Sequence, residues 1–273
     1  MFKLEGNVYA FDSTTIDLCL EVFWWAKFRS TKSGIKAHVL YDVETQIPVF
    51  FHITEATVHD SKVMKEIPYE TNSYYIFDRA YNYFKMLYRI NQIEVYFVLR
   101  PKKNFQYKKI TWNRRLPNNI LSDSTIELTG FYPKQDYPEK LRLVEYWDDE
   151  RERKFSFLTN AMHISALQVA ELYKNRWQVE LFFKWLKQHL KVKKFWGTTE
   201  NAVRIQVYAA ICTYCLVAIV QKDMQLDRST YEVLQILSIS LTDKTCLKDL
   251  FSKTKFQNDK ERSELNVPNL FNF

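Results

Sequence analysis

The stretch that most constrains the fold of this chain is a single helical pattern between His163 and Lys194. Ser165 and Gln168 have the spacing of a capping box, which predicts that a helix begins there. Neither Pro nor Gly follows until Gly197, so we expect the helix to continue without a break. Apolar side chains occupy most of its circumference at roughly 100° per residue, which is typical of a largely buried helix.

Four polar residues share one narrow stripe of this helix. With Glu180 placed at zero, Tyr173 falls at about +20°, Arg176 at about −40° and Lys187 at about −20°. A charged stripe on a helix commonly faces solvent and is linked by ion pairs three or four residues apart. Here a mostly apolar helix directs a carboxylate and two cations along one line, which also fits a helix that serves a functional site.

The spacing of the stripe resembles the motif of a known family. Tyr, two residues, Arg, three residues, Glu, six residues and Lys form the Y-R-E-K helix of DDE transposases of the bacterial insertion-sequence-4 family. In that family the first acidic residue ends the first strand, as Asp12 does after Val8–Phe11. The second precedes small and aromatic residues, as in Asp78-Arg79-Ala80-Tyr81. The resemblance covers most of the chain, from about Val8 to Phe251.

The resemblance implies that Asp12, Asp78 and Glu180 are both the catalytic residues and the metal ligands. Three carboxylates can hold two divalent cations about 4 Å apart, and oxygen ligands with a phosphate substrate favour Mg²⁺, with Mn²⁺ as a substitute. The implied activity is metal-dependent DNA strand cleavage and strand transfer. The implied partners are DNA, as transposon ends and target, and a second copy of the chain in a homodimer assembled on DNA.

Other residues of the helix are candidates for binding the DNA. Arginine can hold a phosphate through two hydrogen bonds, whereas lysine acts as a point charge. Trp177 either stacks on a base or packs in the core. The candidate DNA-binding residues are Tyr173, Arg176, Lys187, Lys184, Lys191 and Trp177.

The rest of the sequence predicts strands that deliver the two aspartates. Apolar runs predict strands at Val8–Phe11 and Ser73–Phe77, each ending directly before an aspartate. Asp is common in turns, so one such aspartate alone would be weak evidence of a site. Further predicted elements are a hairpin of Lys36–Tyr41 with Pro48–Thr54, a helix at Tyr83–Gln92, a strand at Val95–Arg100, and helices at Asn201–Lys222, from Ser229, and at Leu247–Phe251.

The segment 101–158 has a different character, with four predicted strands and no predicted helix. It is rich in Lys and Arg, with Trp112 and Trp147 interleaved, a mixture that suits contact with phosphates and stacking on bases. Exposed edge strands also carry Lys to prevent aggregation. We interpret this segment as a β-strand insertion before the helix that carries Glu180.

The expected fold class is α/β, and the resemblance implies a ribonuclease-H-like mixed sheet flanked by helices. The predicted parts are 1–100 and 159–222 for the catalytic core, 101–158 for the insertion and 223–273 for C-terminal helices with a polar tail. Members of the family usually carry an N-terminal DNA-binding domain, whereas eleven residues precede Asp12. We therefore expect a catalytic domain without that domain.

Composition limits the remaining possibilities. The formal net charge of +7 favours a polyanionic partner, and four glycines leave no Gly-rich phosphate loop. The start of the chain lacks the apolar core of a signal peptide, and Ile205–Val220 is interpreted as a core helix. We expect a cytoplasmic protein without a membrane partner. Two alternatives to a transposase stay open: a metal-dependent nuclease without strand transfer, and a catalytically silent DNA-binding remnant.

Overall fold

The structure is a computed structural model that describes residues 4–29, 32–190, 194–240, 242 and 244–253. The chain forms two compact units, Met1–Cys212 and Thr213–Phe273. The first unit contains a ten-stranded sheet, and the described part of the second unit is helical. The predicted part boundaries at 101, 159 and 223 stay a prediction.

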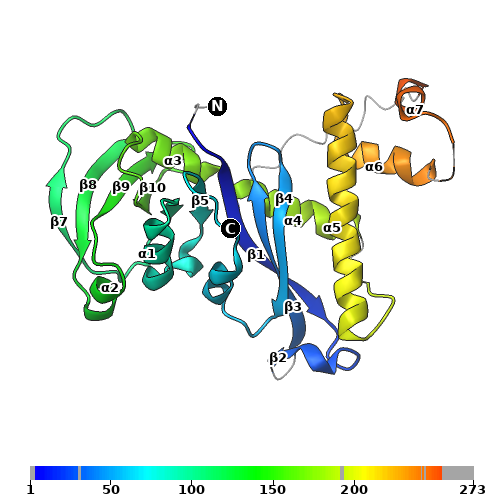
Figure 1. Ribbon diagram of the computed structural model, residues 1–273, viewed down its shortest axis with the longest axis horizontal. Coiled ribbons are helices and arrows are strands. Elements are labelled where there is room, and N and C mark those ends of the chain that lie inside the picture. The colour runs from blue at the N-terminus through cyan, green and yellow to red at the C-terminus, as the bar shows by residue number, and fades with distance from the viewer. Residues whose placement is uncertain (1–3, 30–31, 191–193, 241, 243, 254–273) are drawn as a thin grey trace. The chain divides into compact units, whose positions relative to one another are not determined.

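The sheet is mixed. Its strand order is β2-β3-β1-β5-β6-β10-β9-β8-β7, with β4 paired to β3 (Figure 1). The pairs β1–β5 and β5–β6 are parallel, and the other pairs are antiparallel. The strands are β1 (Val8–Leu18), β2 (Lys27–Arg29), β3 (Lys32–Asp42), β4 (Ile47–Glu55), β5 (Tyr74–Phe77), β6 (Tyr96–Leu99), β7 (Tyr107–Trp112), β8 (Ile120–Leu128), β9 (Leu141–Asp148) and β10 (Arg153–Thr159).

Helices flank this sheet, which confirms the expected α/β class. The α-helices are α1 (Phe84–Gln92), α2 (Phe131–Asp136), α3 (Ala166–Lys174), α4 (Trp177–His189), α5 (Glu200–Asp223), α6 (Thr230–Ile239) and α7 (Leu247–Lys253). Three short 3₁₀ helices are η1 (Trp24–Ala26), η2 (Asp60–Glu66) and η3 (Arg79–Tyr81). Both predicted capping boxes, Ser165 with Gln168 and Ser229 with Glu232, are present.

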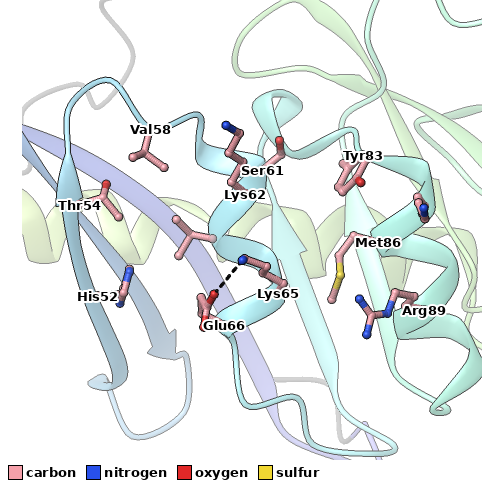
Figure 2. Close-up of a pocket in the computed structure, with 12 residues that line it drawn as sticks. His52, Thr54, Val58, Ser61, Lys62, Lys65, Glu66, Tyr83, Met86 and Arg89 are labelled. Carbon is pink, nitrogen blue, oxygen red and sulfur yellow. Dashed lines mark ion pairs between the residues drawn. The ribbon is translucent and has the colours of Figure 1, made fainter. Parts of the chain in front are cut away.

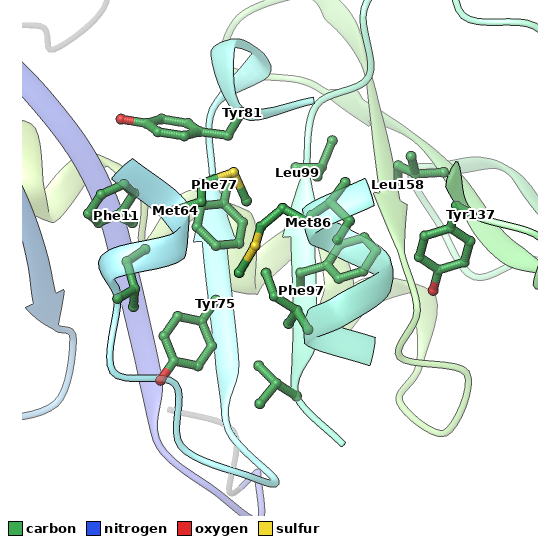
Figure 3. Packing of buried hydrophobic residues seen from close by; sticks show 14 of the residues in the cluster. Phe11, Met64, Tyr75, Phe77, Tyr81, Met86, Phe97, Leu99, Tyr137 and Leu158 are labelled. Carbon is green, nitrogen blue, oxygen red and sulfur yellow. The ribbon is translucent and has the colours of Figure 1, made fainter. Parts of the chain in front are cut away.

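The central strand β5 shows how the core forms on both faces of the sheet. All four of its residues are buried, as expected for a parallel strand covered on both sides. Tyr75 and Phe77 join a core with Phe11, Phe97 and α1 on one face (Figure 3). The alternate residues of β5 join a second core with α3 on the other face. Burial on both faces fixes the register of β5, and so the place where it ends.

The first strand is longer than predicted. Its parallel pairing with β5 does end at the pair Phe11–Phe77, directly before Asp12. The strand nevertheless continues to Leu18, because it pairs with β3 as far as Ser33. The prediction that the strand itself ends at Asp12 is therefore wrong.

The segment 101–158 extends the same sheet. Its four predicted strands are confirmed as β7–β10, and β10 joins them to the rest through its antiparallel pairing with β6. The prediction of no helix here is wrong, because α2 lies between β8 and β9. This helix has only six residues and contains Pro133 in its first turn, where proline is tolerated. Such a short helix leaves no periodic pattern in the sequence.

Helix α5 is less buried than the predicted core helix. By length and composition alone it could cross a membrane, a test that core helices also pass, and 33% of its apolar window is buried. Val203 and Val207 are buried, whereas Ile205, Leu216 and Ile219 are exposed. The helix thus buries one face, and the expectation of no membrane partner stays a prediction.

Candidate active site

Two carboxylates lie at one edge of the sheet, where its parallel strands stop pairing. Asp12 follows the last β1–β5 pair in β1, and Asp78 follows the same pair in β5. Asp78 is in an extended conformation at the start of η3. Because the two strands run parallel and in register, the residues that follow this last pair, Asp12 and Asp78, lie side by side at the same end of the paired segment. This arrangement confirms that the two predicted aspartates are neighbours.

The predicted single helix is in fact two helices, α3 and α4, separated at Asn175 and Arg176. At this break the backbone N–H of Asn175 donates to Leu172 and that of Arg176 to Tyr173, three residues earlier. The Asn175 side-chain amide also donates to the carbonyl of Glu171 at 3.1 Å. Asparagine side chains that bond nearby backbone in this way disturb the regular helix ladder. The prediction of a continuous helix is therefore wrong.

The break leaves the predicted stripe facing the two aspartates. Arg176 Nη1 lies 3.0 Å from Asp12 Oδ2 and 2.6 Å from Glu180 Oε1, so it bridges a carboxylate of β1 and one of α4. The Tyr173 hydroxyl donates to Asp78 Oδ1 at 3.3 Å. These contacts, together with the electrostatic effect of Asp78 on Asp12, place the three predicted carboxylates near one another. Their catalytic and metal-binding roles stay a prediction.

Lys187 attaches the far end of α4 to β1. Its ammonium donates to the Thr14 hydroxyl at 2.6 Å and to the Thr15 carbonyl at 2.9 Å. Arg176 and Lys187 thus contact the protein's own acceptors in this structure. Their predicted contact with DNA phosphates stays a prediction.

The other candidate DNA-binding residues differ in their surroundings. Lys184 has an exposed side chain on α4. Trp177 is partly buried and lines a small pocket together with Tyr173 and Arg176. Lys191 lies outside the described residues.

Asp12 is the electrostatic centre of the site. Burial raises its pKa to about 7, against the opposing effects of the Arg176 guanidinium and of a hydrogen bond from the Ser13 backbone N–H. The negative charges of Asp78 and Glu180 raise it further. A buried carboxylate repelled by two others is stabilised by any cation that enters among them. Arg176 supplies that positive charge here.

Asp60 is a neighbour of the site that the sequence analysis did not single out. Its Oδ1 accepts from the Ser13 hydroxyl at 2.8 Å and lies 3.2 Å from Lys36 Nζ. It comes from η2, 47 residues beyond Ser13. No motif in the sequence pointed to Asp60. The hydrogen bond from Ser13 to Asp60 fixes the side chain of the residue that directly follows Asp12.

His38 adds a titrating group behind Asp60, and we expect it to make stability depend on pH. The His38 side chain is buried, and its Nε2 lies 2.9 Å from the Thr54 hydroxyl. Burial lowers its pKa from 6.5 to about 4, although Asp60, with Oδ1 3.9 Å from Nδ1, opposes that shift. Lys36 and His52 lower it further.

The sign of the pH effect follows from this lowered pKa. As the pH falls below 6.5, the unfolded chain binds a proton at His38 before the folded chain does, so stability is lost between about pH 6.5 and pH 4. We expect the contribution of His38 to the free energy of unfolding to be about 2 kcal/mol lower at pH 5 than at pH 7.5. The raised pKa of Asp12 changes stability in the opposite sense over this range, so the His38 contribution is measured as the difference between the wild-type chain and His38→Gln in urea denaturation at the two pH values. Relative to the wild-type chain, His38→Gln should therefore gain about 2 kcal/mol in the free energy of unfolding between pH 7.5 and pH 5. His59→Gln, which changes an exposed histidine, should keep the wild-type dependence on pH, and equal slopes in both variants would contradict the assignment.

The three carboxylates suit a hard divalent cation by their donor atoms. All three offer oxygen, and the repulsion that raises the pKa of Asp12 is the repulsion that a cation relieves. Among the described residues, no three His, Cys, Asp or Glu side chains are grouped closely enough to hold an ion. Arg176 stands between Asp12 and Glu180 in this arrangement. Metal binding to all three carboxylates would therefore require its guanidinium to move.

Comparisons with known proteins agree with this geometry. The family model described as "Transposase DDE domain" matches residues 3–216. A putative transposase, y4zB, of Sinorhizobium fredii is 34% identical over 235 residues, which are 84% of this chain and 64% of that protein. A probable transposase for insertion sequence element IS5377 of Geobacillus stearothermophilus is 34% identical over 210 residues, 75% of this chain and 54% of that protein. The chain thus spans a little over half to about two thirds of the length of these relatives.

A solved structure shares the fold. The piggyBac transposase, in a synaptic complex with hairpin DNA, superposes with a TM-score of 0.53 at 13% identity, covering 98% of this chain and 58% of that chain. The likeness is consistent with the expected ribonuclease-H-like fold.

A further sequence relative fits the resemblance to the insertion-sequence-4 family. It is a putative transposase for insertion sequence element IS4SA of Synechocystis, which is 27% identical over 88% of this chain and 68% of its own length. With the model of the family matched over residues 3–216, the chain belongs to the DDE transposase family.

Proposed function

We propose that this chain is the catalytic domain of an insertion-sequence transposase, which cleaves DNA strands and joins the transposon ends to a target. The observation that carries the proposal is the proximity of the three carboxylates: Arg176 bridges Asp12 and Glu180, and Asp78 follows the same β1–β5 pair as Asp12. Membership of the DDE transposase family supports it and does not favour a nuclease without strand transfer or a silent remnant. The net charge of +7 suits a DNA substrate.

Enzymes of this family depend in general on divalent metal ions. In the proposed function, Asp12, Asp78 and Glu180 hold two Mg²⁺ ions, with Mn²⁺ as a substitute. When bound, such ions supply activation of water or of a 3′-hydroxyl and stabilisation of the leaving oxygen during in-line attack. No covalent protein nucleophile is required.

The chain's own residues prepare the site for this chemistry. Arg176 neutralises Asp12 and Glu180 and holds α4 against β1. The Tyr173 hydroxyl orients Asp78 through its hydrogen bond. Lys187 fixes the next turns of α4 to β1 through Thr14 and Thr15. We also propose that two copies of the chain assemble on the DNA before cleavage.

Mn²⁺ binding measured by calorimetry tests the triad without knowledge of the DNA ends. We expect Asp12→Asn, Asp78→Asn and Glu180→Gln each to weaken Mn²⁺ binding by at least about tenfold, because each removes a charged ligand from one shared site. Asp17→Asn is the matched control, since Asp17 lies on the same strand as Asp12 with an exposed side chain. It should leave binding unchanged.

The same titration can contradict the proposal. Mn²⁺ binding that is equal in the wild-type chain and all three variants would separate the carboxylates from any common metal site. If the wild-type chain alone does not bind Mn²⁺, the titration is repeated with duplex DNA present, because substrate phosphates complete many such sites. Absence of binding there as well would favour a silent remnant.

A further inference from the structure

A second, positively charged feature lies along the same edge of the sheet as the carboxylates. Arg79 directly follows Asp78 at the end of β5, and Arg100 directly follows β6, the next strand in the sheet. With Lys102, Lys103 and Lys154 they line a cavity of about 260 Å³ beside Phe155. We call these five cations and Phe155 the cation pocket. The strand order thus places it on the side of Asp78 away from Asp12.

The arginines around this pocket are crowded with like charge. The guanidinium carbons of Arg100, Arg151 and Arg153 lie 5.2, 5.5 and 4.5 Å from the centre of the Phe155 ring. Burial lowers the pKa of Arg151, and the charges of Arg153 and Arg100 lower it further, against the effect of Asp148. Cations gathered at this density are stabilised when an anion binds among them.

Carboxylates of the protein neutralise only part of this charge. Glu145 forms an ion pair with Lys154 at 2.7 Å, and Asp148 lies 3.6 Å from Arg151. Among the described residues, no ion pair to Arg79 or Arg100 is present, and the buried Nε of Arg79 has no hydrogen-bond partner. A guanidinium that lines a cavity and has an unused N–H donor can donate a hydrogen bond to a phosphate oxygen.

Aromatic side chains connect the pocket to the carboxylates. The Phe155 ring lies 6.1 Å from that of Phe157, which lies 4.8 Å from Tyr173. The Tyr173 hydroxyl in turn donates to Asp78. A nucleic-acid strand whose reacting phosphate lies at Asp78 would therefore place neighbouring phosphates within reach of this edge of the sheet.

We propose that the cation pocket binds backbone phosphates of the DNA strand whose reacting phosphate lies at Asp12, Asp78 and Glu180. The inference rests on the proposed function, which supplies DNA as the substrate. It differs from the earlier assignment of phosphate binding to the Y-R-E-K stripe. Arg176 and Lys187 contact the protein's own oxygens, whereas Arg79 and Arg100 have donors directed to no carboxylate among the described residues.

A second basic hollow of the same unit provides a matched control. A cavity of about 450 Å³ lies between β4, η2 and α1, and its lining includes Lys62, Lys65, Lys85 and Arg89. Figure 2 shows how Lys62, Lys65 and Arg89 lie around it. Lys65 is paired with Glu66 at 3.4 Å, and Val58, Val63 and Met86 make much of the lining apolar. Lys85 and Arg89 are exposed. Removing these two charges changes the net charge as much as removing two from the cation pocket.

The test compares duplex DNA binding of three double variants by fluorescence anisotropy at about 0.15 M salt, where distant charges are screened. Arg79→Gln with Lys102→Gln should weaken binding by at least about tenfold and lower the slope of log K against log salt by roughly 2. Lys85→Gln with Arg89→Gln should change affinity less than about threefold. Lys102→Gln with Lys103→Gln, which alters only exposed side chains and so leaves folding intact, should lower the slope similarly.

Other outcomes would overturn the inference. If the pocket variants and the control variant lose the same DNA affinity, then DNA affinity depends on the total charge and not on the cation pocket. The proposed function would be unaffected by that result. Inorganic phosphate titrated alone is the second probe: phosphate binding lost with Arg79 while DNA affinity stays unchanged would identify a free-anion site instead. A wild-type chain that binds Mn²⁺ through its triad but binds no DNA would overturn both the inference and the proposed substrate.

Discussion

Replacing Glu180 with Gln should reduce DNA cleavage by at least about a thousandfold while leaving DNA affinity within about threefold of wild type. The change removes one negative ligand and keeps the shape of the side chain. Loss of about 4 kcal/mol of transition-state stabilisation corresponds to a factor of about 1,000 in rate, and a metal centre contributes several kcal/mol. The measurement is single-turnover cleavage of a radiolabelled duplex that carries the element's ends, in Mg²⁺ and in Mn²⁺.

The contacts of Glu180 explain why folding should survive this change. Glu180 Oε1 is 2.6 Å from Arg176, and the amide oxygen of Gln can still accept a hydrogen bond there. Asp17→Asn is again the control, and it should cleave at the wild-type rate. Cleavage that persists in Glu180→Gln would remove Glu180 from the catalytic site. Cleavage absent from the wild-type chain as well, despite DNA binding, would support the silent remnant.

Local pattern was sufficient to predict the parts of this site that lie within single elements. The stripe of Tyr173, Arg176, Glu180 and Lys187 follows from helical periodicity, and in the structure these four side chains contact β1, Asp78 or one another. The ends of the β1–β5 pairing follow from apolar runs bounded by aspartate. The stripe alone did not identify a functional site, because charged residues on one side of a helix more often form its solvent-exposed face. The family resemblance was also needed.

Features that depend on partners distant in the sequence were missed. The extension of β1 beyond Asp12 is set by β3, whose residues there lie 15 to 25 positions away from their partners, from Leu18–Ser33 to Ser13–His38. The break between α3 and α4 depends on whether the Asn175 side chain turns back to its own helix, which its identity does not decide. The cation pocket joins cations that follow β5 and β6 with Lys154 of β10, about 50 to 75 residues away along the chain. No window of sequence contains both groups.

The helices of the site also depend on a buried ion pair outside it. Arg142 of β9 holds Asp123 of β8 with two hydrogen bonds, from Nε at 2.7 Å and from Nη2 at 2.9 Å. Its remaining nitrogen donates to the carbonyls of Ala161 and Ile164, in the segment that leads from β10 into α3. Arg142 and Asp123 are both buried. One guanidinium thus joins the sheet to the start of the helix pair that carries Tyr173, Arg176 and Glu180.

Arg142→Met should therefore lower the free energy of unfolding by about 3 to 5 kcal/mol, because it leaves the Asp123 carboxylate buried without its cation. Equilibrium denaturation in urea at pH 7 measures the loss. Lys140→Met, an exposed cation directly before β9, should cost less than about 0.5 kcal/mol. Adding Asp123→Leu to Arg142→Met should recover part of the loss, since the double change removes the unpaired charge. A double variant less stable than the single one would show that packing at Arg142, and not the buried charge of Asp123, governs this joint between the sheet and the catalytic helices.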